Sequence, residues 1–68
     1  MDFKALKTFR KKKNLTQKQL SELSGIGCVT ISRMESGKLK ESSASTLLKL
    51  AKSLECHVSD IAILSDDV

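Results

Sequence analysis

Residues 16–35 read TQKQLSELSGIGCVTISRME, and this stretch decides how the rest of the chain can fold. It opens with Thr16 and Gln19 in the spacing of a capping box, in which each side chain accepts from the backbone N–H group of the other residue. Gly25 stands where a helix must end in a sharp turn, because glycine adopts the left-handed conformation most readily. The pattern therefore predicts a helix over residues 17–24.

A second short helix is predicted directly after this turn, over residues 28–36. Ile31 and Met34, three residues apart, give it one apolar face that points inward. Gly37 follows as its stop signal. The remaining side chains of this helix are therefore expected to face away from the core.

A further helix is predicted ahead of this pair, running to about residue 13. Asp2 stands at its start and can act as its N-cap. Phe3, Leu6 and Phe9 recur at three-residue spacing and define the face that packs inward. The helix is therefore expected to contribute three large apolar side chains to the core.

Two more helices are predicted beyond a polar loop at residues 38–42. Ser43 can cap the fourth helix, and Ser59 can cap a short fifth helix over residues 60–64. Residues 65–68 follow as a short acidic tail. The apolar face of the fourth helix, which is expected to cover the core, consists of Leu47, Leu50, Ala51 and Leu54.

Size and charge limit the partners that this chain can have. Its 68 residues make one small domain, near the size at which a single core is only marginally stable without help. Residues 1–40 hold ten Lys or Arg against three acidic residues, a net charge of +7, whereas residues 41–68 carry −3. A basic half suits a polyanion. We assign the lysines at 11–13 to the dipole at a helix end in preference to direct phosphate contact.

Other classes of protein find little support in the sequence. Cys28 and Cys56 lack the close spacing of a zinc site and are too few for a disulfide framework, so a reducing cytoplasm is expected. The longest apolar run, at residues 61–64, is far shorter than the roughly 20 residues of a membrane span, and no signal peptide is expected. His57 has neither a metal-spaced ligand nor a nucleophile beside it. We therefore expect no enzymatic activity, no metal and no other cofactor.

From about residue 6 to residue 61 the chain resembles the Cro and phage-repressor type of helix-turn-helix DNA-binding domain. The resemblance implies an all-α, compact five-helix, lambda-repressor-like domain over residues 1–64, with the helix-turn-helix in its second and third helices. Ser21 and Ser24 replace small apolar residues common in the family, so their hydroxyl groups are expected to bond back to the helix. The resemblance is carried by Leu6, Phe9, Arg10, Leu15, Thr16, Gln17, Leu20, Gly25, Ile26, Ile31, Ser32, Glu35, Gly37, Leu47, Leu50, Ala51, Leu54 and Ile61.

This resemblance implies that the helix at residues 28–36 enters the major groove of double-stranded DNA, with the preceding helix across the backbone. Arg33 has the clearest chemistry, since a guanidinium group can give two hydrogen bonds to guanine. The alternative is a solvated or phosphate-pairing arginine. The implied base-reading residues are Gly27, Cys28, Val29, Ser32 and Arg33.

The resemblance also implies contacts that position the domain without reading bases. It pairs Arg10 of the first helix with Glu35 at the end of the third, as a structural ion pair. Exposed lysines in loops are often simply solvated, and that reading stays open for the two loop lysines. The implied phosphate contacts are Thr16, Gln17, Ser36, Lys38 and Lys40.

The sequence therefore predicts a transcriptional regulator, repressor-like, that binds DNA as a homodimer. Leu48, Ile63 and Leu64 are the expected self-complementary patch, unless the C-terminal segment folds back onto its own core. Cys28 stands at a helix N-terminus, where a thiol can become reactive, although a small groove-facing residue is the simpler reading. The rival function is an antitoxin or adaptor whose main partner is a protein and which binds DNA weakly and without specificity.

Overall fold

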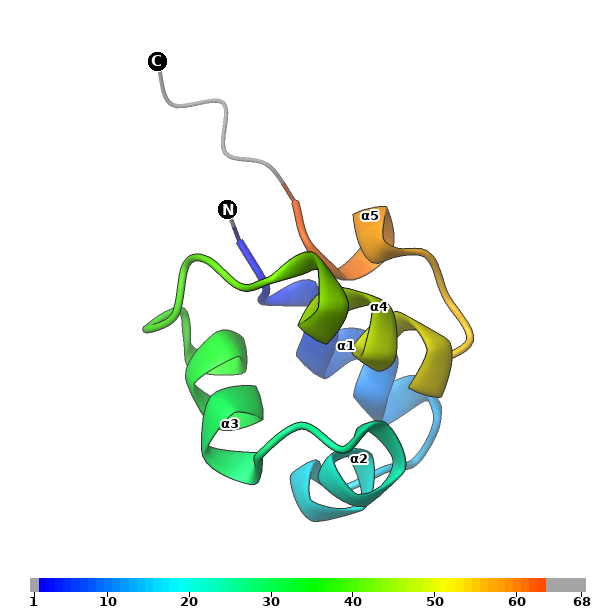
Figure 1. Ribbon diagram of the computed structural model, residues 1–68. Coiled ribbons are helices and arrows are strands. Elements are labelled where there is room, and N and C mark those ends of the chain that lie inside the picture. Colours follow the sequence, from blue (N-terminus) through cyan, green and yellow to red (C-terminus); the bar gives the residue numbers. More distant parts are fainter. Residues whose placement is uncertain (1, 64–68) are drawn as a thin grey trace.

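A computed structural model describes residues 2–63, and within that range the chain folds into five α-helices around one core (Figure 1). The expected all-α, five-helix fold is confirmed. Leu64 and the expected acidic tail lie outside the described residues. The helices are α1 (Ala5–Lys12), α2 (Gln17–Ser24), α3 (Cys28–Ser36), α4 (Ala44–Ser53) and α5 (Val58–Ile61).

Both α2 and α3 begin and end at the residues that the sequence predicts. Thr16 Oγ1 accepts from the backbone N–H of Gln19 at 3.0 Å, and Gln19 Oε1 accepts from the backbone N–H of Thr16 at 2.8 Å. Gly25 and Gly37 close the two helices with φ angles of 76° and 84°, in the left-handed region where a side chain would be strained. The capping and turn residues thus fix both lengths locally.

The first helix begins later than predicted. Asp2 does not cap α1, whose N-cap residue is Lys4; instead Asp2 Oδ1 accepts from the backbone N–H of Lys4 at 2.8 Å. The reason lies at the other end of the chain, because Asp2 pairs with Ile63 through two backbone hydrogen bonds of 2.7 and 2.8 Å. This pairing holds Asp2 in extended geometry and delays the start of the helix.

The fifth helix begins two residues before the start, and ends three residues before the end, of the predicted span 60–64. His57, and not Ser59, is its N-cap residue. Ile61 at its last turn is fully buried in the core, while Ile63 is held in the extended pairing with Asp2. Because that pairing cannot continue a helix, Ile63 does not lie on α5 as expected.

The core sits where all five helices meet. α4 packs against α2 and α5, and α1 packs against α3 and α5, so the α2–α3 pair is held from two sides. The buried apolar residues of the core are Phe3, Leu6, Leu20, Ile31, Met34, Leu47, Leu50, Ala51, Leu54 and Ile61.

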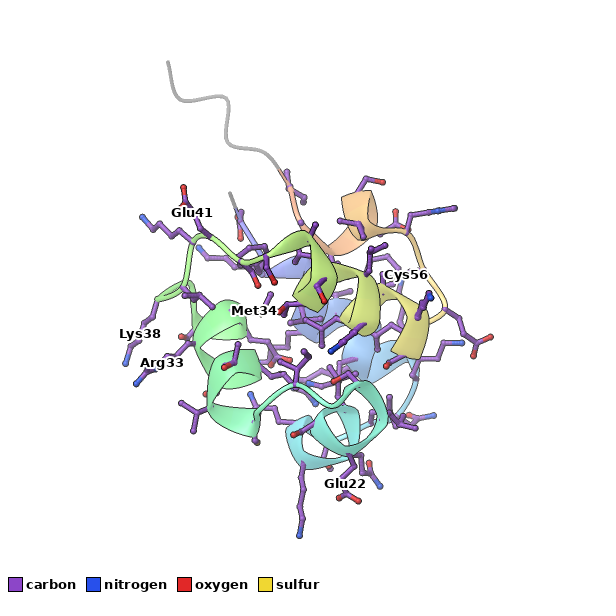
Figure 2. The ribbon with its side chains drawn as sticks, in the orientation of Figure 1. Glu22, Arg33, Met34, Lys38, Glu41 and Cys56 are labelled. Carbon is purple, nitrogen blue, oxygen red and sulfur yellow. The ribbon has the colours of Figure 1, made fainter. Side chains whose placement is uncertain are left out.

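Cys56 packs at the edge of this core, between α4 and α5 (Figure 2). Burial raises the pKa of the Cys56 thiol; nearby Asp60 adds to the effect and Lys13 opposes it. The thiol therefore stays protonated at neutral pH, which suits a small apolar filler.

Within residues 2–63 no helix combines the length and the apolar character that crossing a membrane requires.

Candidate nucleic-acid interface

The outer face of α3 is exposed to solvent. Arg33 and Met34 are neighbours in sequence but point in opposite directions, Met34 toward the core and Arg33 into solvent (Figure 2). Val29 leaves 63% of its surface exposed although it is apolar. Cys28 and Ser32 are also exposed. The helix thus buries one stripe and offers the other to a partner, as its sequence pattern predicts.

A shallow, open groove runs along this face and gathers residues from α2, α3 and the turn after α3. Of the predicted base-reading and phosphate-contacting residues, Gly27, Thr16 and Lys40 are exposed but do not line it. Arg33 and Lys38 project side by side from one edge of the molecule (Figure 2). The groove is lined by Gln17, Cys28, Val29, Ser32, Arg33, Ser36 and Lys38.

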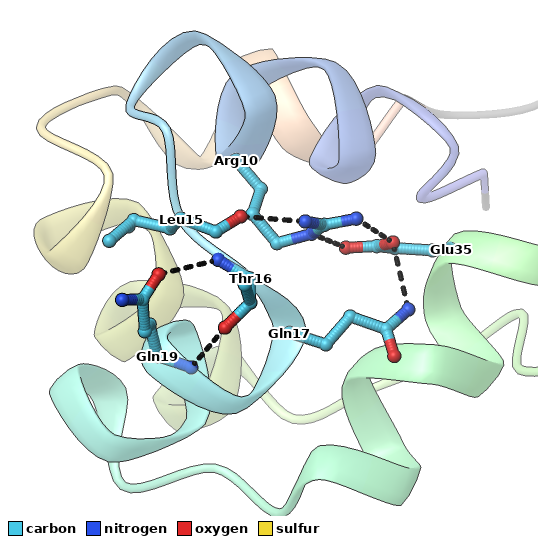
Figure 3. Close-up of polar contacts among 6 residues, drawn as sticks. All are labelled: Arg10, Leu15, Thr16, Gln17, Gln19 and Glu35. Carbon is cyan, nitrogen blue, oxygen red and sulfur yellow. Dashed lines mark hydrogen bonds and ion pairs between the residues drawn. The ribbon is translucent and has the colours of Figure 1, made fainter.

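Arg10 and Glu35 form a buried ion pair between α1 and α3, the helix that lines the groove (Figure 3). Arg10 Nε donates to Glu35 Oε2 at 2.7 Å and Arg10 Nη2 donates to Glu35 Oε1 at 3.0 Å. A third bond runs from Arg10 Nη1 to the carbonyl oxygen of Leu15 at 2.7 Å. The hydrogen bond to Glu35 raises the pKa of the Arg10 guanidinium group, desolvation opposes this, and the charge of Glu35 adds to it. The pair joins α1 to α3 and to the residue that leads into α2.

Gln17 belongs to the same network, a contact that the sequence did not reveal. Its Nε2 donates to Glu35 Oε1 at 3.1 Å, so one N–H of the side chain is already occupied (Figure 3). The two residues are 18 positions apart and meet only because α2 packs on α3. No local pattern could have signalled this contact. It holds the Gln17 amide at the edge of the groove.

The serine hydroxyl groups of α2 follow the prediction only in part. Ser24 donates to the carbonyl oxygen of Leu20 at 2.7 Å, one turn back along the helix, as expected. The expectation for Ser21 is wrong, because its hydroxyl donates forward to the carbonyl oxygen of Ile26 at 2.6 Å. That bond fastens the turn between α2 and α3, since Ile26 lies beyond the glycine. The angle between the two helices is thereby supported by a side chain.

Apolar residues outside the core mark a second surface. Leu48 on α4 and Ile63 in the extended segment are each 52% exposed, and these are the two members of the expected dimer patch that the structure describes. Leu23 on α2 is 62% exposed and was not singled out from the sequence. Its spacing of three residues from the buried Leu20 fits the helical period and would place it on the inward face, so the sequence pattern does not indicate its exposure.

A family model described as helix-turn-helix matches residues 6–61. The match includes all of α2, α3, α4 and α5 and all but the first residue of α1. No curated protein and no solved structure matched the chain.

Proposed function

Since the chain belongs to the Cro/C1-type helix-turn-helix family of DNA-binding transcription regulators, we propose that it reads a specific operator in the major groove and acts as a repressor. The observation that carries this proposal is the groove on the outer face of α3, in which Arg33 and Val29 stand exposed beside Gln17 at the start of α2. A major groove is about 12 Å wide and admits one α-helix.

Within this proposal the exposed side chains of α3 read bases. Arg33 donates two hydrogen bonds to guanine, Val29 contacts a thymine methyl group, and Ser32 bonds to a base edge. Gly27 and Cys28 are small and allow the start of the helix to approach the bases closely. With so few long polar side chains, part of the specificity comes from DNA shape and bridging water.

The residues around α3 position it on the sugar–phosphate backbone. The second N–H of the Gln17 amide faces a phosphate while the first stays on Glu35. Thr16 contributes through the helix start that it caps. Ser36, Lys38 and Lys40 follow the reading helix and contact the next phosphates.

The active form in this proposal is a homodimer on a two-fold-symmetric site. Leu48 and Ile63 supply exposed apolar surface for a partner copy, with Leu64 next along the chain. Dimers of this motif read half-sites about 34–36 Å apart. We assign the protein to the cytoplasm, because Cys28 and Cys56 are both free thiols, as a reducing compartment favours.

The test is selection of bound sequences from a pool of random DNA duplexes, followed by titration of the selected duplex against a scrambled one at two salt concentrations. We expect a two-fold-symmetric sequence bound at least about a thousandfold more tightly than the scrambled duplex. If no sequence is enriched and all binding disappears as salt rises, the positive charge of residues 1–40 attracts DNA only by electrostatics and without sequence preference. The protein-partner function would then replace this one.

Arg33→Ala is expected to weaken binding to the selected duplex by about 1–3 kcal/mol, or roughly five- to 150-fold. The reason is the loss of a bidentate contact to guanine. Affinity for the scrambled duplex should fall much less, as measured by fluorescence anisotropy on both duplexes.

Arg33→Lys separates base reading from charge alone, because lysine keeps the charge but has no planar fork of donors. It should bind the scrambled duplex like the unaltered protein and the selected duplex nearly as weakly as Arg33→Ala. Equal losses for Arg33→Ala on both duplexes, with full rescue by lysine on both, would assign Arg33 to a phosphate instead.

A further inference from the structure

Three lysines of the N-terminal segment lie on one face of α1 and its N-cap. Lys4, Lys7 and Lys11 are spaced by three and four residues, which places them on the same side of a helix. All three are exposed. They are called the basic face of α1 below. Leu6 points inward, away from this face, and the buried Arg10 lies one turn after Lys7.

The lysines at 11–13 follow one another in sequence, but they do not have the same surroundings in the structure. Lys13 Nζ forms an ion pair with Glu55 Oε1 at 3.1 Å, and Lys12 Nζ lies 5.0 Å from the ring centroid of Phe9. Lys11 has neither kind of partner among residues 2–63, and the same holds for Lys4 and Lys7. Within residues 2–63 the basic face of α1 therefore forms no ion pair, whereas Lys12 and Lys13 have partners in the domain.

The basic face of α1 borders the candidate interface. The Lys4 side chain reaches the end of α3, since a Cβ atom added to Gly37 would lie 3.4 Å from Lys4 Cε. Gly37 directly precedes Lys38, which lines the groove. Further along α1, Lys7 stands one turn before Arg10, which is bonded to Glu35 of α3. The lysines thus continue the positive charge of the groove along the adjoining helix.

Among residues 2–63 no carboxylate forms an ion pair with Lys4, Lys7 or Lys11. Residues 1–40 carry a net charge of +7, and their only acidic residue within α3, Glu35, is balanced by Arg10. Most carboxylates belong to residues 41–68, whose net charge is −3. The surface formed by α1 and α3 is therefore complementary to the regular negative charge of a DNA duplex.

We infer that the basic face of α1 binds backbone phosphates of the duplex just outside the base pairs that α3 contacts. This inference rests on the proposed function and extends its interface beyond the helix-turn-helix. Lys4, Lys7 and Lys11 supply affinity without sequence preference, because each neutralised phosphate releases condensed counterions. The footprint on DNA is accordingly longer than the recognised sequence.

The test compares two double variants with the same change of charge. Lys7→Gln with Lys11→Gln removes two charges from the basic face of α1, while Lys49→Gln with Lys52→Gln removes two exposed charges from α4. Lys4 is left intact because it contacts the end of α3. Binding is measured over a range of salt concentrations on the selected duplex, and on one extended by about one helical turn, roughly 10 base pairs, at each end.

On the extended duplex, the α1 variant should show a slope of log affinity against log salt that is shallower by about 1.8, or 0.9 per lost contact. The α4 variant should keep the slope of the unaltered protein, and circular dichroism should show both variants folded. The difference between the α1 variant and the unaltered protein should shrink on the short duplex.

Equal slopes for the α1 and α4 variants would overturn the inference. An unchanged slope together with weaker self-association of the α1 variant in sedimentation would overturn it too, and would assign the lysines to the acidic half of a second copy. Failure of the proposed function is seen separately, as the absence of any preference for the selected duplex by the unaltered protein. The salt slopes of the two variants can then still be compared on scrambled DNA.

Discussion

Replacing Arg10 with alanine should lower the free energy of unfolding by about 3–5 kcal/mol. The substitution leaves the buried Glu35 carboxylate without a cation and the carbonyl oxygen of Leu15 without its donor. Gln17 alone cannot replace three hydrogen bonds and a charge. A chain of this length has a stability of roughly 3–10 kcal/mol, so the variant loses about a third of that stability or more and is largely unfolded at the lower end of the range. Urea denaturation followed by circular dichroism measures the change.

Lys13→Ala is the matched control, because it also removes a cation from an ion pair. Lys13 and Glu55 meet at 3.1 Å with side chains that are 41% and 76% exposed, so its removal should change stability by less than about 1 kcal/mol. A double variant, Arg10→Met with Glu35→Leu, should recover stability relative to Arg10→Ala, since no unpaired charge stays buried. An unchanged melting temperature for Arg10→Ala would show that the pair does not hold the fold.

Ile31→Ala should destabilise the domain by about 2–5 kcal/mol. Ile31 is fully buried and is one of the two apolar side chains by which α3 enters the core. Removing three carbon atoms there loses apolar burial and leaves a cavity in a core built from few residues. DNA binding should weaken as the folded fraction falls and recover when temperature is lowered toward that of maximum stability. The unfolding transition is again read by circular dichroism.

Val29→Ala on the same helix provides the contrast. Val29 is 63% exposed, so its truncation should change stability by no more than about 0.5 kcal/mol. It should nevertheless weaken binding to the selected duplex, through loss of contact with a thymine methyl group. If both truncations destabilised the domain equally, α3 would not be oriented with one face inward and the other toward DNA.

The parts of the fold that could be predicted are those with a local cause. The ends of α2 and α3 follow from a capping box and two glycines, whose partners lie within a few residues. The start of α1 and the end of α5 were misplaced because the pairing of Asp2 with Ile63 joins opposite ends of the domain. The start of α5 has a local cause that the sequence analysis missed, since the backbone N–H of His57 donates to Asp60 Oδ2 at 3.0 Å. No short-range pattern describes a contact between residues so far apart in sequence.

In the candidate site, too, the features with a local cause could be predicted and those that depend on the packing of helices could not. Exposure of Arg33 and Val29 follows from the helical period, because Ile31 and Met34 determine which face is buried. The bond between Gln17 and Glu35 requires the packing of α2 on α3, and could not be predicted from either helix alone. Whether each exposed side chain meets a base or a phosphate depends on the docked position of the duplex, which the sequence of the protein does not encode by itself.

The outer face of α3 also has an evolutionary consequence. Among the residues that the structure describes, the side chains of Cys28, Val29, Ser32 and Arg33 form no hydrogen bond within the domain, whereas Gln17 is tied to the Arg10–Glu35 pair. Mutations at those four positions can therefore accumulate with little effect on folding, while position 17 is constrained by its neighbours. Under the proposed function, a lineage carrying this scaffold can change its operator one side chain at a time without passing through unfolded intermediates.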